Sequence, residues 1–76
     1  MNESEMRGRL TAAEKAMVCT LVRAQRRRDE VARTGSIDRL IAIDSVLVGV
    51  YREAKARFGD ERARRMDRLA LRAART

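Results

Sequence analysis

Proline, histidine and tryptophan are absent from this sequence of 76 residues, and cysteine, tyrosine and phenylalanine occur once each. A single cysteine forms no internal disulfide, and without histidine or a second cysteine it has no partners for a zinc site. Two aromatic rings are too few for the stacking platforms of single-strand-binding proteins. We therefore expect no metal and no other cofactor, and we interpret Cys19 as an inert thiol.

Long hydrophobic runs are also absent. The longest one, residues 40–50, contains an aspartate, and a membrane-spanning helix needs about 20 apolar residues. The first nine residues carry both signs of charge without an apolar segment behind them, which is not typical of a secretion signal. With the lone cysteine, these features predict a cytoplasmic protein that does not associate with membranes.

The sequence also lacks the motifs that are typical of enzymes. The sequence contains no phosphate-binding glycine loop and no dinucleotide-binding glycine pattern. Its acidic residues have no histidine, metal site or activated nucleophile to work with. We expect a protein that is not an enzyme and has no small-molecule substrate.

The first nine residues are predicted to form a mobile N-terminal arm, followed by a single helical domain over residues 10–76. Thr11 and Glu14 have the spacing of a capping box, in which each side chain binds the other residue's backbone amide. The helical pattern that follows predicts a first helix over residues 11–33. Gly35 then suits a left-handed helix end.

Two further helices are predicted after that glycine. Ser36 is a suitable N-cap for a helix over residues 37–58, which would end before Gly59. Asp60 is expected to cap a third helix over residues 61–74. The fold class is therefore all-α: a small three-helix bundle, made of a long helical hairpin and a shorter basic C-terminal helix.

Oligomerisation is expected because a domain of this size buries only about 60% of the surface of its unfolded chain. The second helix is predicted to be the central core element, because apolar residues cover about half of its circumference and others lie on the far side. We expect the far side to be the interface of a homo-oligomer, unless its members are simply small surface residues. This predicted interface comprises Ala42, Val46 and Gly49.

Asp44 is the one acidic residue inside the apolar arc of the second helix. Buried carboxylates require a partner, and Arg28 falls inside the apolar stripe of the first helix. We therefore predict a buried structural pair of Asp44 with Arg28. On this hypothesis, Asp44→Ala would lower the stability by about 1 to 3 kcal/mol by leaving the arginine unpaired.

Positive charge is the most prominent feature of the composition. Sixteen arginines and two lysines against eleven acids give a net charge of +7, which favours an acidic partner such as nucleic acid. A GC-rich genome would raise the ratio of arginine to lysine, but it would not produce the positive excess. Five arginines of the third helix fall within about 100° of one another. They are Arg64, Arg65, Arg68, Arg72 and Arg75.

The sequence is compatible with two functions for these arginines. Alternatively, the arginines have no binding function and simply form the solvent-exposed side of the helices. The first is a regulatory or accessory protein that binds nucleic acid through these arginines, extended by Arg23, Arg26 and Arg27 on the polar side of the first helix. The second is an accessory factor or inhibitor that docks on a larger acidic protein. A membrane surface is a poorer fit, because the apolar face of the third helix is alanine-rich and has no aromatic residue.

Overall fold

The computed structural model describes residues 9–75, in which three helices pack together and no strand is present. They are α2 (Ala12–Thr34), α3 (Ile37–Phe58) and α4 (Asp60–Ala74). This architecture confirms the predicted small three-helix bundle. Within the same residues, no helix has an apolar stretch long enough to cross a bilayer. The predicted mobile arm lies, apart from Arg9, outside the described residues.

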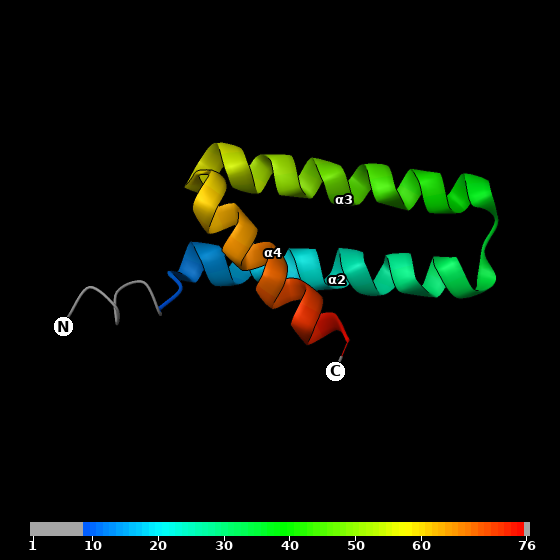
Figure 1. Ribbon diagram of the computed structural model, residues 1–76, viewed down its shortest axis with the longest axis horizontal. Helices are drawn as coiled ribbons and strands as arrows, with labels where there is room; N and C mark the ends of the chain where they lie inside the picture. Colours follow the sequence, from blue (N-terminus) through cyan, green and yellow to red (C-terminus); the bar gives the residue numbers. More distant parts are fainter. Residues whose placement is uncertain (1–8, 76) are drawn as a thin grey trace.

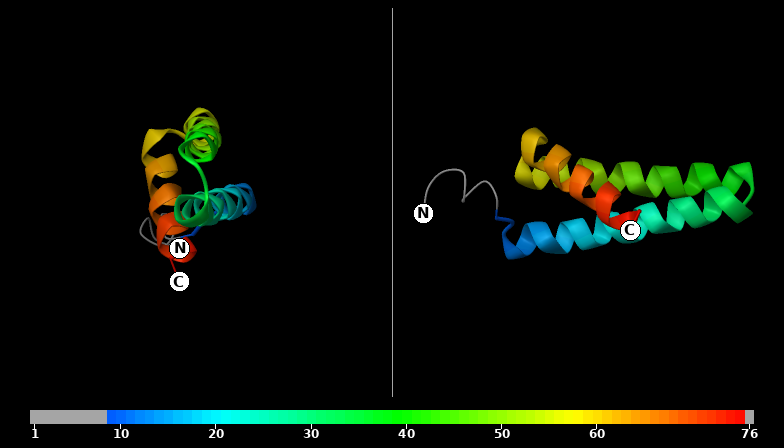
Figure 2. Two further views of the ribbon diagram at one scale, coloured as in Figure 1. Left: turned by 90° about the vertical axis from the view of Figure 1, so that its right-hand side faces the viewer. Right: turned by 60° about the horizontal axis from the view of Figure 1, so that its bottom comes forward.

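Helices α2 and α3 form a long antiparallel hairpin, and α4 packs against one end of it (Figure 1). After the turn at Gly59, α4 crosses the hairpin diagonally and lies beside both of its helices (Figure 2). It packs more extensively on α2 than on α3. Among the helices of residues 9–75, no third one packs against the other end of the hairpin, around Gly35.

The buried core lies where the three helices meet. Alanine and methionine fill much of it, which permits a close approach of α4 to the hairpin. The buried members of the core are Met17, Leu21, Ala54, Ala63, Met66 and Ala70. Larger side chains, including Tyr51 and Phe58, pack around it and remain partly exposed.

The prediction that the second helix is the central core element was wrong, because Ala54 is the only buried residue of α3. The reason is that α4 is too short to cover the whole of α3. Helix α4 has 15 residues and α3 has 22, so at about 1.5 Å per residue α4 is roughly 10 Å too short to cover the hairpin. Large apolar side chains of α3 are also exposed, among them Ile37 (76%) and Ile41 (60%).

The start of α2 is as predicted. The Glu14 amide donates to the Thr11 hydroxyl at 3.1 Å, and the Thr11 amide donates to the Glu14 carboxylate at 3.0 Å, which together make the capping box. Ser36 caps α3 by accepting from the Arg39 amide at 3.3 Å. The left-handed conformation predicted for Gly35 is wrong, since its φ is −95°. The position has no room for a side chain, because a Cβ there would lie 2.7 Å from the carbonyl oxygen of Val31.

Gly59 makes the turn into α4 and is the only described residue with positive φ, at 89°. Residues with a side chain rarely adopt this conformation. Asp60 does not cap α4 as predicted, because Gly59 occupies the N-cap position and no side chain binds the first amides. Asp60 is instead the first helical residue, and its carboxylate pairs with Lys55 at 3.3 Å and with Arg64 at 3.0 Å.

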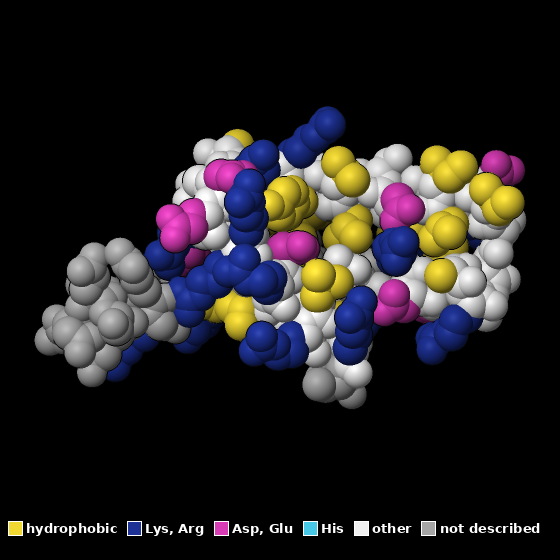
Figure 3. Space-filling view, in the orientation of Figure 1, with side chains coloured by type: hydrophobic (Ala, Val, Ile, Leu, Met, Phe, Trp, Pro, Cys, Tyr) yellow, Lys and Arg dark blue, Asp and Glu magenta, His cyan; other side chains and the backbone are white. Residues whose placement is uncertain are grey.

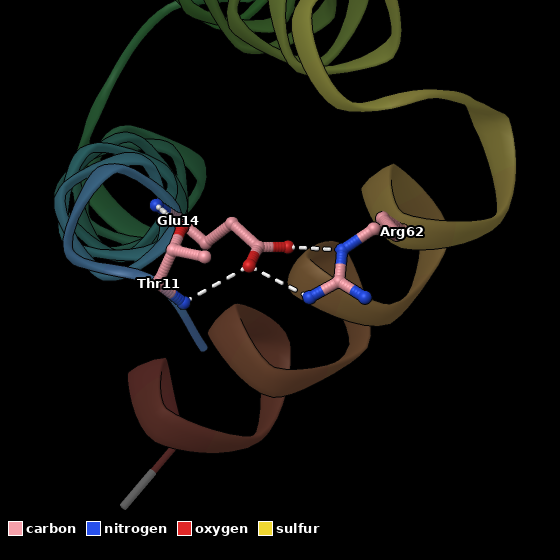
Figure 4. A network of polar contacts seen from close by, with 3 residues as sticks. All are labelled: Thr11, Glu14 and Arg62. Carbon is pink, nitrogen blue, oxygen red and sulfur yellow. Dashed lines mark hydrogen bonds and ion pairs between the residues drawn. The ribbon is translucent and has the colours of Figure 1, made fainter. Parts of the chain in front are cut away.

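An ion pair between Glu14 and Arg62 joins the start of α2 to the first turn of α4 (Figure 4). The guanidinium donates through Nε to Glu14 Oε2 at 2.5 Å and through Nη2 to Oε1 at 2.7 Å. Glu14 is almost completely buried. The hydrogen bond from Arg62 is the main reason that the pKa of Glu14 falls to about 2, against an opposing effect of burial. The same pair raises the pKa of Arg62.

The predicted pair of Arg28 with Asp44 is present, with Arg28 Nε 2.5 Å from Asp44 Oδ1. Its predicted burial was wrong, since the two side chains are 40% and 44% exposed. The pair bridges α2 and α3 in the part of the hairpin that α4 does not cover. Solvent therefore screens it, and its contribution to stability is that of a surface ion pair.

We predict that Glu14→Gln lowers the free energy of unfolding by about 2 kcal/mol at pH 7, because Arg62 loses a buried charged partner. Glutamine retains the ability to complete the capping box, so the change isolates the ion pair. The lowered pKa of Glu14 stabilises the folded state above about pH 4.5, and this contribution is lost as the pH falls toward about 2. Urea unfolding curves of the two proteins should therefore converge at low pH.

Glu30→Gln is the matched control, because Glu30 is an exposed glutamate of the same helix. The assigned role of Glu14 would be contradicted if both variants lowered the free energy of unfolding equally at pH 7. It would also be contradicted if Glu14→Gln remained less stable than the parent protein at pH 2.

For Asp44→Ala we now expect a loss of less than about 1 kcal/mol, below the range predicted from the sequence, because the pair is largely solvated. Thermal or urea unfolding measures this directly. A loss of about 2 kcal/mol or more would mean that another part of the structure covers the pair.

Candidate functional site

Helix α4 has two clearly different faces. Ala63, Met66 and Ala70 are buried against the hairpin. On the opposite side lie five arginines, which we call the arginine stripe. Its members are Arg64, Arg65, Arg68, Arg72 and Arg75.

The members of the stripe differ in their contacts. Arg64 pairs with Asp60 one turn earlier, and Arg65 is half-buried and has contacts of its own. Arg68, Arg72 and Arg75 are exposed, and within residues 9–75 none of them forms an ion pair. The free positive charge of α4 is therefore concentrated in its C-terminal half.

Arg26 of α2 extends toward this end of α4. Its Nη2 donates to the carbonyl oxygen of Ala73 at 3.5 Å. The last carbonyls of a helix have no partner within the helix and carry partial negative charge, so an arginine stabilises this end. The contact also brings the guanidinium of Arg26 to the part of α4 that carries Arg72 and Arg75.

Arg23 and Arg27 are the other two predicted arginines of α2. Both are exposed. Arg23 lies one turn before Arg26 and about 60° from it around the helix. Arg27 lies about 100° from Arg26 and lines a shallow hollow between α2 and α3 together with Val31 and Arg39. The contact with α4 therefore joins Arg26 to the stripe, Arg27 lies toward the hollow at α3, and Arg23 lies between them around α2, about 40° from Arg27.

One face of the molecule shows where charged and hydrophobic side chains gather (Figure 3). Lysine and arginine side chains gather over α4 and over the adjoining part of α2. Hydrophobic side chains gather over α3 and along its boundary with α2, toward the end of the hairpin that α4 leaves uncovered.

Asp67 is the only acidic residue in the C-terminal half of α4. It is partly buried, and this burial raises the pKa of its carboxyl group. In the described residues it forms no ion pair with an arginine of the stripe. Asp67 therefore does not neutralise Arg68 or Arg72 by direct contact.

Arg62 was not identified from the sequence, although it belongs to the same arginine-rich segment. The signal was available. At 100° per residue, Arg62 falls about 40° from Met66, within the buried side of α4, and Glu14 falls about 20° from Leu21 on α2. Two opposite charges on two apolar faces predict a buried pair, by the reasoning that found Arg28 and Asp44.

The three residues of the predicted oligomer interface are all exposed. They border two different hollows on α3. Ala42 and Val46 line the hollow that contains Arg27, whereas Gly49 lines a second one with Ile41 and Val48.

In residues 9–75, no cluster of three or more potential ligand side chains could hold a metal ion. Comparisons of the chain with models of protein families, with curated proteins and with solved structures give no match.

Proposed function

We propose that the protein binds nucleic acid through the phosphate backbone, using the arginine stripe of α4 together with Arg26 and Arg23 of α2. The observation that carries this proposal is the contact of Arg26 with the carbonyl oxygen of Ala73. This contact joins Arg26 to a residue 47 positions later in the sequence, at the end of α4 that carries Arg72 and Arg75.

The chemistry of arginine supports a phosphate ligand. Its planar guanidinium donates two parallel hydrogen bonds to phosphate oxygens and stays charged at all physiological pH values. Arg68, Arg72 and Arg75 have no acidic partner among residues 9–75, so binding a phosphate would not require breaking an ion pair.

The surface favours binding without base recognition. The only two aromatic residues, Tyr51 and Phe58, pack around the core on α3 rather than beside the stripe. Backbone contacts position a protein on nucleic acid but do not specify a sequence. The proposed role is that of a regulatory or accessory protein with little sequence preference.

We further propose that the protein works in the cytoplasm and as a homo-oligomer. A single exposed thiol, Cys19, fits a reducing compartment. Exposed isoleucine and valine side chains on α3 support self-association.

We predict that affinity for a short DNA duplex falls a few hundred-fold between about 50 and 200 mM salt, because roughly five counterions leave the phosphates on binding. Changing both Arg68 and Arg72 to Gln should lower the salt slope by about two and weaken binding to different sequences equally. Helix content, measured by circular dichroism, should stay the same because glutamine is also a good helix former. Fluorescence anisotropy across a salt series measures the affinity.

The matched control changes Arg27 and Arg39 to Gln, which removes the same charge from the hollow between α2 and α3. This variant should keep the salt slope of the parent protein. Equal effects of the two double variants would mean that net charge, not the stripe, drives binding. Absence of salt-dependent binding to duplex and single strands near 50 mM would leave an acidic protein as the ligand of the stripe.

A further inference from the structure

The outward face of α3, on the opposite side of the helix from the buried Ala54, is entirely exposed. Between Asp38 and Arg52, seven residues of this face lie within about 60° of Ser45, counted at 100° per residue. We call them the outward face: Asp38, Ile41, Ala42, Ser45, Val48, Gly49 and Arg52.

The outward face has a seven-residue repeat. Ile41 recurs as Val48, Ala42 as Gly49, and Ser45 lies seven residues from both Asp38 and Arg52. A repeat of this length keeps one face directed at a neighbouring helix. The large apolar members are Ile41 and Val48, whose side chains are 60% and 49% exposed.

Gly49 is unexplained by the packing of a single chain. It lies well inside α3, where glycine destabilises a helix relative to alanine. A Cβ at this position would have no atom within 4 Å, and Gly59 is the only described glycine with positive φ. The backbone of α3 is therefore bare at Gly49, with Ala42 one repeat earlier, and this permits the close approach of a second helix.

We propose that two copies of the protein pair through their outward faces, with the two α3 helices antiparallel around a two-fold axis at Ser45. A residue that precedes Ser45 by a given number of positions then lies at the same height as the residue that follows Ser45 by the same number in the other copy. Ile41 packs beside Val48 of the other copy along one side of the contact, and Ala42 lies beside Gly49 along the other side, where the small residues let the two backbones approach closely. The inference rests on the proposed homo-oligomer and does not depend on nucleic-acid binding.

Charge determines the orientation. In the antiparallel pair, Asp38 of each copy lies opposite Arg52 of the other, which makes two ion pairs. A parallel pair in the same register would place Asp38 against Asp38 and Arg52 against Arg52. Like charges opposite each other disfavour that arrangement.

The interface is small because one helix from each copy makes it. Interfaces of this kind belong to the low end of the size range, which is typical of weak or transient association. We expect a reversible dimer with a dissociation constant in the micromolar range. None of the arginines of the stripe belongs to the outward face, so the proposed dimer leaves both stripes free.

Sedimentation equilibrium of the full chain tests the proposal. Gly49→Leu should weaken the dimer at least about tenfold, because its side chain prevents the close approach of the two helices. The variant should unfold at the same or a higher temperature, since leucine is the better helix former and meets no atom of its own chain. Cys19→Leu is the control, because it adds a leucine at an exposed position of α2 and should dimerise like the parent protein.

A charge exchange tests the orientation separately. Asp38→Arg alone and Arg52→Asp alone should each weaken the dimer, and the two together in one chain should restore it. A protein that stays monomeric up to about 100 µM would overturn the proposal, as would a dimer that Gly49→Leu leaves intact. Single charge changes without effect, or a double variant that fails to restore the dimer, would overturn the antiparallel pairing.

Discussion

The ion pair of Glu14 with Arg62 fixes where α4 lies, and the rest of the surface depends on that position. It holds the first turn of α4 against the start of α2, 48 residues earlier in the sequence. From there α4 crosses the hairpin with its small buried residues inward and its arginines outward. Because α4 is shorter than the hairpin helices, the loop end stays uncovered. A cationic surface and an apolar surface therefore occupy different parts of one small molecule.

Local signals in the sequence predicted the elements well. Helix boundaries depend on caps and glycines within a few residues, so Thr11, Ser36 and Gly59 were sufficient to place three helices to within one residue. The pairing of Arg28 with Asp44 was also predicted, because helical periodicity alone places each charge on an apolar face. The two wrong details of capping, at Gly35 and Asp60, concern backbone geometry that residue type does not determine.

The packing of the helices on one another was harder to predict from the sequence. Periodicity identifies the apolar face of a helix, but it does not show how much of that face a neighbour covers. For this reason α3 was predicted to be the buried centre, and Asp44 was predicted to be buried with it. The same limit applies to the site, since the arginine stripe follows from the periodicity of α4, whereas its junction with Arg26 depends on the crossing of two helices.

The apolar and cationic surfaces suit different partners. The uncovered α3 presents isoleucine and valine beside small residues, which fits a second copy of the chain. The stripe on α4 presents exposed guanidinium groups, among them those of Arg68 and Arg72, which suit an anionic ligand. Two stripes on one dimer would raise the affinity for a long nucleic acid through multivalency.

The central claim is that phosphate binds where α4 meets Arg26, and an NMR titration with a short DNA duplex tests it most directly. The Nε resonances of Arg68, Arg72 and Arg26 should shift on binding, while those of Arg27 and Arg39 should stay unchanged. Shifts confined to Arg27 and Arg39, or spread equally over all exposed arginines, would contradict the claim.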